Sequence, residues 1–169
     1  MTTTTSRLIT LQEANRMLPL LKHITDSIMS TWERIIKLRG WHEAFQAGQY
    51  ELQPTDMTHE AVKLEMNTAI DRINDYIREV EQLGCFVEEF KRGIVNFPSL
   101  YGGRKVFLCW RAGEDTVEHW HELDETWHDR IAISEPSSFF NDKQKQELSQ
   151  RRQTDRRSGD GDLYSRGYY

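Results

Sequence analysis

The segment between residues 109 and 130 gathers most of the side chains in this sequence that can perform chemistry. It holds a cysteine, three histidines, three tryptophans and several acidic residues. If the stretch around His119 and His121 is a strand, both imidazoles point to one face, because side chains alternate along a strand. Such a pair can chelate a metal ion, with Glu114 or His128 as a third ligand and one position open for water. Imidazole and carboxylate ligands together suit zinc, iron or manganese.

The same pattern also fits a solvated strand face that binds nothing. Histidines and acidic residues are common on the outside of edge strands, where they discourage aggregation. The spacing matches no zinc-protease or zinc-finger motif, so the solvated face is the stronger interpretation. The competing hypothesis is a divalent-metal site formed by Glu114, His119 and His121.

The cysteine of this segment, Cys109, has two interpretations as well. It can act as a nucleophile with His121 as its base. Its apolar neighbours Leu108 and Trp110 favour instead a small, buried and unreactive thiol. The sequence therefore predicts a buried cysteine more strongly than a catalytic one.

The tryptophans and arginines of the segment suggest either a ligand site or structural contacts. The three tryptophans can line an aromatic pocket, although holding a sheet onto helices is the more common role. Arg111 and Arg130 can clamp an anion, although an ion pair with Glu114 or Asp129 is the simpler arrangement. The candidate ligand-binding residues are Trp110, Arg111, Glu114, Trp120 and Arg130.

A small antiparallel sheet must position these side chains. After Gly84 the sequence contains four short runs rich in β-branched and aromatic residues, separated by turn signals with glycine or proline. The pattern predicts three or four strands in a meander. The runs are 85–87, 94–97, 106–110 and 116–122, and the connection 111–115 joins the last two.

Two long helices are predicted before the sheet. The first begins with a capping box at Thr10–Glu13 and ends near Arg39, with Gly40 as its left-handed stop. The second begins within Thr55–Thr58 and ends at Leu83. Apolar residues recur in both at alternating steps of three and four, which is the seam spacing of packed helices. The pattern therefore predicts a coiled-coil-like antiparallel hairpin.

The predicted fold class is α+β, in which the helical hairpin carries the small antiparallel sheet as a cap at one end. Residues 1–140 form a single domain in this interpretation. Residues 141–169 lose apolar periodicity and are rich in Gln, Arg, Asp, Ser and Gly, so they are predicted to be a polar, disordered tail. Within that tail, residues 141–150 are able to extend a helix.

Composition excludes several classes of protein. No run approaches the roughly 20 apolar residues of a membrane span, and the amino terminus has no apolar stretch typical of a signal peptide. The formal net charge of −5 argues against nucleic-acid binding. Two cysteines are too few for a disulfide framework, which predicts reduced thiols and a cytoplasmic protein.

Four segments carry a resemblance to a known family. They read Thr-Leu-Gln-Glu-Ala-Asn-Arg-Met-Leu-Pro-Leu-Leu, Gly-Ile-Val-Asn-Phe-Pro, Val-Phe-Leu-Cys-Trp-Arg-Ala-Gly-Glu and Trp-His-Glu-Leu. Over roughly residues 8–133 the chain resembles the bacterial family called domain of unknown function 2203. The family signature falls on Leu108, Cys109, Trp110, Gly113, Glu114, Trp120 and His121. Arg130 matches the closing arginine, although residues 125–129 lack the glycine that the family has before it. The resemblance implies a fold and a signature, and no known activity.

Two classes of function follow. The first is a non-enzymatic interaction or scaffold protein that acts through its helical hairpin. Apolar residues beside the seam, such as Trp32, Ile36 and Leu64, need a third layer, which predicts a homodimeric four-helix bundle, with the sheet as the rival cover. A different protein is another possible partner. The alternative is a metal- or small-ligand-binding protein, or a small metal-dependent enzyme, that uses the Glu114–His121 region.

Overall fold

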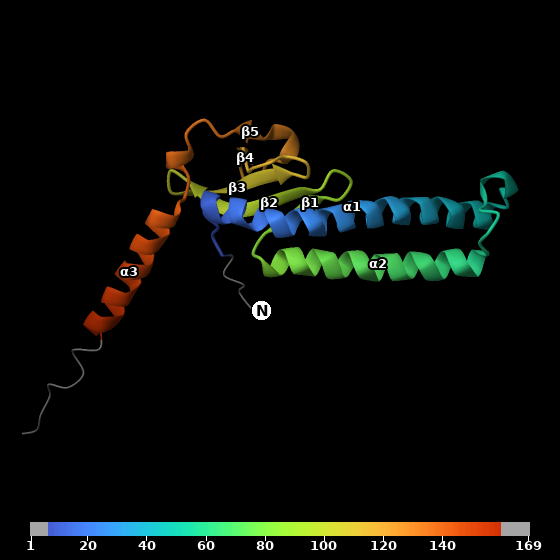
Figure 1. Ribbon diagram of the computed structural model, residues 1–169, viewed down its shortest axis with the longest axis horizontal. Coiled ribbons are helices and arrows are strands. Elements are labelled where there is room, and N and C mark those ends of the chain that lie inside the picture. Colours follow the sequence, from blue (N-terminus) through green and yellow to red (C-terminus); the bar gives the residue numbers. More distant parts are fainter. Residues whose placement is uncertain (1–6, 160–169) are drawn as a thin grey trace, which may run out of the picture.

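The computed structural model describes residues 7–159 and confirms the predicted α+β class. Over these residues three α-helices and five strands follow one another, and the strands come between the second and third helices in the sequence (Figure 1). The elements are α1 (Leu11–Ala47), α2 (His59–Gln82), β1 (Phe86–Glu89), β2 (Ile94–Tyr101), β3 (Arg104–Arg111), β4 (His119–His121), β5 (Ile131–Ala132) and α3 (Asp142–Gly159). Short 3₁₀ turns cover Tyr50–Leu52, Trp127–Asp129 and Pro136–Ser138.

Helix α1 begins where its cap predicts and ends later than predicted. The Thr10 hydroxyl accepts a hydrogen bond from the Glu13 amide at 3.0 Å, as a capping residue does. The predicted stop at Gly40 is wrong, because the helix continues to Gly48, which has a left-handed φ of 67°. A glycine inside a helix costs only about 1 kcal/mol relative to alanine. The packing of the following turn, with Ala44 buried, outweighs that cost.

Helix α2 has the predicted limits. The Thr58 hydroxyl accepts from the Ala61 amide at 3.2 Å, and Gly84 follows the helix with a left-handed φ of 92°. The two helices lie side by side and run in opposite directions (Figure 1). Their buried facing residues are Leu21, Ile24, Ile28, Ile35 and Leu38 from α1 and Val62, Ala69, Ile73 and Val80 from α2.

The sheet is a five-stranded antiparallel meander in the order β1-β2-β3-β4-β5. It has one strand more than the largest number predicted, because residues 131–132 pair with β4 despite carrying almost no strand signal of their own. It lies along the amino-terminal half of α1 and not across a helix end (Figure 1). Asn15 accepts from the Val117 amide at 2.8 Å, and the rings of Trp32 and Phe90 lie 5.2 Å apart.

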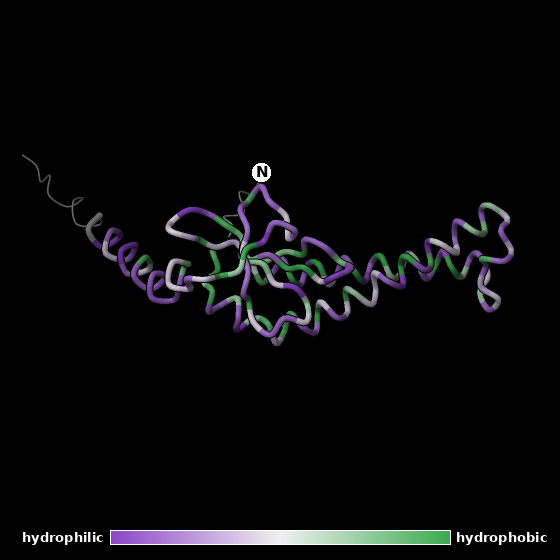
Figure 2. The backbone as a smooth tube through the Cα atoms, turned by 90° about the horizontal axis from the view of Figure 1, so that it is seen from above, coloured by the Kyte–Doolittle hydropathy of each residue, from purple (hydrophilic) through white to green (hydrophobic). Residues whose placement is uncertain are grey.

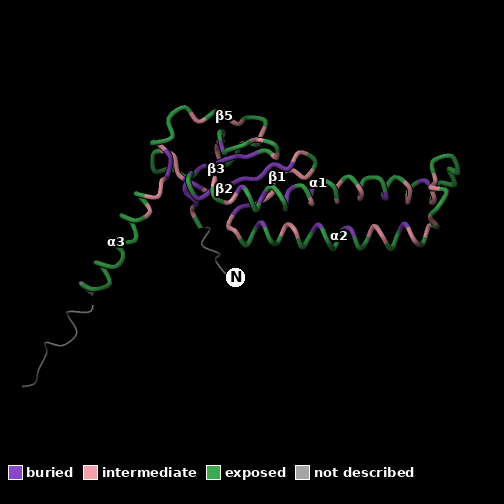
Figure 3. Tube along the Cα trace, in the orientation of Figure 1, coloured by how far each residue is buried: buried purple, intermediate pink, exposed green. Residues whose placement is uncertain are grey.

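The core lies where α1 meets the sheet. Buried residues concentrate there, whereas the far end of the helix pair is mostly exposed or half-buried (Figure 3). On the face of the sheet that meets α1, the buried apolar side chains of β2 and β3 are Val95, Phe97, Val106, Leu108 and Trp110. No helix in the described part of the chain combines the length and the apolar character needed to cross a membrane.

The predicted disordered tail is helical over residues 142–159, where α3 forms; residues 160–169 lie outside the described part of the chain. Figure 2 shows α3 as hydrophilic along nearly its whole length. The helix that residues 141–150 were able to extend is present, and the prediction of disorder is wrong for residues 151–159. Gln, Lys, Glu and Arg are strong helix formers, and the side chain of Asn141 accepts from the Gln144 amide at 3.0 Å as an amino-terminal cap.

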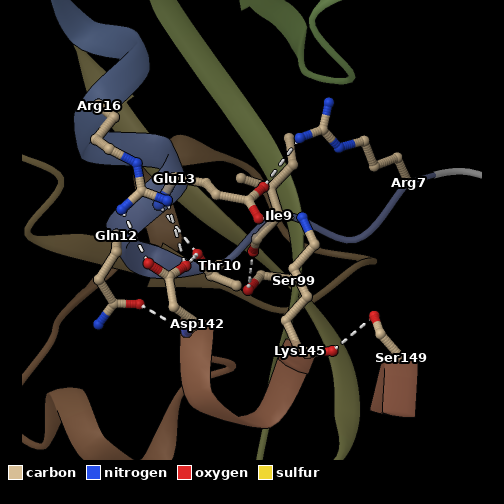
Figure 4. A network of polar contacts seen from close by, with 10 residues as sticks. All are labelled: Arg7, Ile9, Thr10, Gln12, Glu13, Arg16, Ser99, Asp142, Lys145 and Ser149. Carbon is tan, nitrogen blue, oxygen red and sulfur yellow. Dashed lines mark hydrogen bonds and ion pairs between the residues drawn. The ribbon is translucent and has the colours of Figure 1, made fainter. Parts of the chain in front are cut away.

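The first turn of α3 is anchored to the start of α1 (Figure 4). The Asp142 carboxylate accepts from the Thr10 hydroxyl at 2.7 Å and from the Arg16 guanidinium at 2.9 Å. The hydrogen bond from Arg16, followed by that from Thr10, lowers the pKa of Asp142 below its ordinary value of 3.8. Lys145 also pairs with Glu13. These contacts connect residues about 130 positions apart in the sequence.

Candidate functional site

The strand register divides the candidate residues between the two faces of the sheet. Cys109 lies opposite His119 on β4 and opposite Asn96 on β2. Alternation places these three side chains and His121 on the outer face, away from the helices. It also places Trp110 and Trp120 on the inner face. The two histidines were predicted to lie on the same face of the strand, and the register agrees with this prediction.

The connection between β4 and β5 folds back over the outer face, and residues 122–130 are here named the strap. Two carboxylates hold it. The Trp127 amide donates to Oε2 of Glu88 at 2.9 Å, and Nη1 of Arg130 donates to Oε1 of Glu114 at 2.8 Å. The strap thus covers a set of polar side chains that would otherwise face water.

The first half of this polar network surrounds His121, whose side chain is only 1% exposed. Its Nδ1 lies 2.8 Å from the carbonyl oxygen of Glu122. Its Nε2 lies 3.2 Å from Oδ1 of Asn96 and 3.3 Å from Oε1 of Glu88. Asn96 also donates from Nδ2 to the same Glu88 oxygen at 2.9 Å. Glu88 therefore joins β1, β2, β4 and the strap.

The second half of the network surrounds Glu114. Its Oε1 accepts from the Arg111 amide at 2.7 Å and from Arg130 at 2.8 Å. Its carbonyl oxygen accepts from the Trp110 indole at 2.9 Å. Burial lowers the pKa of Arg130, but the hydrogen bond and the charge of Glu114 outweigh this and raise it overall. The ion pair predicted between Arg130 and Glu114 is present.

The two imidazoles are associated with different carboxylates. Nδ1 of His119 lies 3.4 Å from Oε2 of Glu114, whereas His121 lies beside Glu88. Side chains two residues apart on one strand face are separated by about 7 Å. Within residues 7–157, no three His, Cys, Asp or Glu side chains gather in a way that could hold a metal ion. The proposed ligands Glu114, His119 and His121 have no common centre here, and metal binding stays a prediction.

The predicted ligand-binding residues do not line one pocket. Trp110 is fully buried on the inner face, and Trp120 stacks on Tyr101 with ring centroids 4.9 Å apart. Arg111, Glu114 and Arg130 lie at the outer face or its edge. The structural role predicted as the alternative for the tryptophans agrees with these positions. Ligand binding by this set stays a prediction.

Cys109 is poorly suited to nucleophilic attack. Its side chain is fully buried, and this burial raises the pKa of the thiol to about 12, despite the nearby charge of Arg130. Burial likewise raises the pKa of Cys85 to about 12. A thiolate, and not a thiol, is the reactive form. Both thiols are therefore protonated at neutral pH.

We expect both cysteines to resist alkylation in the native protein. Treatment with iodoacetamide at pH 8 for one hour should modify less than about a tenth of either thiol, whereas in urea both should react completely. Mass spectrometry of tryptic peptides measures each site separately, so that Cys85 serves as the internal control. Rapid native modification of Cys109 alone would show that it is an accessible nucleophile.

Sequence reasoning missed two members of the network, Glu88 and Asn96. A signal for Asn96 exists, because it is a polar residue inside the apolar run Ile94–Pro98, in a strand buried on both faces. Glu88 has no such signal. It lies at a register irregularity between Val87 and Glu89, and a bulge of this kind redirects a side chain in a way that alternation does not predict.

A second candidate surface lies on the helix pair beyond the sheet. It is named the distal helix surface and is defined by Ile36 of α1 and Ile70 of α2, which are 47% and 39% exposed. No strand covers this part of α1 and α2 (Figures 1 and 3). At its tip, ring nitrogens of His42 and His59 lie 2.9 Å apart. Each helix thus exposes an apolar side chain in this part of the helix pair.

Fold and site together define a class of α+β protein in which a long helix pair packs on a five-stranded meander whose outer face is braced by a polar network. The chain belongs to the family described as "Uncharacterized conserved protein (DUF2203)", whose model matches residues 7–133. The predicted family is thus confirmed, and the match ends before α3. No curated protein and no solved structure matches the chain.

Proposed function

We propose that this protein is a non-enzymatic interaction protein that associates with a second copy of itself through the distal helix surface. The observation that carries the proposal is an apolar stripe on α1 that the sheet covers for only part of its length. Leu18 is 2% exposed and Thr25 is fully buried, and both lie in the half of α1 along which the sheet lies (Figure 1). Trp32 contacts the ring of Phe90 in the turn that follows β1, and Ile36, one turn further along α1, is 47% exposed.

A helix pair needs a third layer to bury a stripe of this width. A second copy is a suitable occupant, because an antiparallel helix pair placed on its two-fold mate forms a four-helix bundle. Both helices contribute apolar residues to the surface, Ile36 from α1 and Ile70 from α2. Exposed charges of both signs flank them, with Glu33 and Lys63 as examples, so the surface is able to complement itself.

The sheet-face network supports a structural role in preference to catalysis. Its carboxylates, Glu88 and Glu114, each accept hydrogen bonds from donors of the same chain. The thiol of Cys109 is protonated and covered. The polar residues of the family signature therefore stabilise the strap and the sheet. The helices then provide the surface for association.

Sedimentation equilibrium at micromolar concentration tests this proposal. The expected mass is about twice the 20.0 kDa of the chain. The double variant Ile36→Glu with Ile70→Glu should be monomeric, because unpaired charges buried in the bundle cost about 3 kcal/mol or more, which weakens association by over about 100-fold.

The matched control is Leu20→Glu, which changes a similarly exposed leucine outside the distal helix surface and should leave the dimer intact. Circular dichroism establishes that both variants keep their helices. A parent protein that sediments as a monomer at this concentration contradicts the proposal, and so does an equal loss of association in Leu20→Glu.

A further inference from the structure

A pocket of about 730 Å³ lies at the edge of β2, separate from the distal helix surface. It forms because the first half of β2 pairs with β1, whereas its second half bonds the segment before α1. β1 pairs with β2 as far as Asn96, opposite Phe86. At Pro98 the carbonyl oxygen accepts instead from the amide of Ile9, at 2.7 Å. The pocket opens between these two partners, next to the end of α2.

The wall of the pocket is mainly apolar. Two phenylalanine rings, Phe86 and Phe107, meet at nearly a right angle with centroids 5.1 Å apart. The apolar lining also includes Leu8, Cys85, Pro98, Val106 and Leu123. A volume of several hundred Å³ with such a lining is typical of sites for small organic molecules. The occupant must therefore have a sizeable apolar body.

The charged residues at the pocket favour a negatively charged ligand. Arg7 and Lys105 contribute two cations, and Glu81 contributes one acid. Lys105 makes no ion pair with any of residues 7–157. Arg7 donates one hydrogen bond to Glu13 at 3.2 Å, and its side chain is otherwise largely exposed, which leaves further N–H groups for a ligand. The lining is thus positive overall.

We propose that this pocket binds a monocarboxylate with an apolar tail, such as a medium-chain fatty acid. The tail lies against Phe86 and Phe107, and the carboxylate lies near Lys105 and Arg7. Burial of methylene groups contributes about 0.8 kcal/mol each, so the tail supplies most of the affinity and the cations supply selectivity for an anion. The proposal does not depend on self-association through the helices.

Isothermal titration of the full chain with decanoate tests the proposal, with decan-1-ol as the uncharged ligand of equal chain length. Decanoate should bind saturably with one molecule per chain, and decan-1-ol should bind roughly fivefold more weakly. In Lys105→Glu the affinity for decanoate should fall by about fivefold or more, whereas that for decan-1-ol should not change. The control Lys91→Glu alters an exposed lysine outside the pocket and should behave as the parent.

A second variant, Leu123→Glu, separates the apolar contribution from the charge. Leu123 is half-exposed, so the substitution should leave the fold intact and weaken both ligands. Three results would overturn the proposal. They are an absence of saturable decanoate binding up to millimolar concentration, equal binding of acid and alcohol, and an equal effect of Lys105→Glu and Lys91→Glu.

Discussion

Replacement of Trp110 by alanine is expected to lower the free energy of unfolding by about 3–5 kcal/mol, as deletion of a fully buried aromatic side chain does. Trp110 lies on the inner face of β3 with no exposed surface. The change leaves a cavity between the sheet and α1, and it removes the indole hydrogen bond to the carbonyl oxygen of Glu114. Urea denaturation followed by circular dichroism measures the loss.

The matched control for this prediction is Trp127→Ala. Trp127 lies on the strap, is half-buried, and contacts the guanidinium groups of Arg92 and Arg111 through its ring. Its backbone amide, which bonds Glu88, survives the substitution. The expected loss is therefore smaller, at about 1–2 kcal/mol. If the two variants were equally stable, Trp110 would not be the residue that holds the sheet to the helices.

Replacement of Glu88 by alanine is expected to cost about 3–5 kcal/mol, which is the usual result of removing one partner from a buried polar network. The Glu88 side chain is 19% exposed. Its loss leaves the Nδ2 group of Asn96 and the amide of Trp127 without their acceptor, and it leaves Nε2 of His121 with Oδ1 of Asn96 as its remaining partner. Each buried donor left unsatisfied costs about 1–3 kcal/mol.

Hydrogen exchange gives the Glu88 prediction a second readout. The amide of Trp127 should exchange much faster in Glu88→Ala, because the strap loses the contact that holds its middle. The control Glu118→Ala removes an exposed carboxylate near the same sheet and should change stability by no more than about 0.5 kcal/mol. A loss below about 1 kcal/mol in Glu88→Ala, with unchanged exchange at Trp127, would refute the role of Glu88 as the hub of the network.

Local signals predicted several helix ends correctly, because capping involves residues only a few positions apart. Thr10, Thr58 and Gly84 act as the sequence indicates. Local sequence signals do not determine whether α1 ends at Gly40 or at Gly48. Both glycines can adopt a left-handed conformation, and the packing of the turn between them decides which one does.

For α3, apolar periodicity failed to predict a helix that the sequence does form. Residues 142–159 lack an apolar stripe because α3 has no extensive core to face, and periodicity therefore gave no helix signal. Helix propensity and the cap at Asn141 were present in the sequence. The contacts of Asp142 with Thr10 and Arg16 depend on a neighbour far away in the chain, which no local pattern includes.

The sequence by itself determined the α+β class, the family and the shared face of His119 and His121, because these depend on periodicity, short motifs and strand alternation. Only the tertiary structure decided what those side chains do. Glu88 and Asn96 reach His121 from strands that lie 25 or more residues earlier, through a bulge and a register that are non-local. The strap then covers the network, and the two histidines that fit a metal site or a solvated face in the sequence take different places in it. His121 is buried and hydrogen-bonded, whereas Nδ1 of His119 lies 3.4 Å from Oε2 of Glu114 without a hydrogen-bond partner in the described part of the chain. The physical reason is that burial and pairing belong to the packed chain, and not to the residue types.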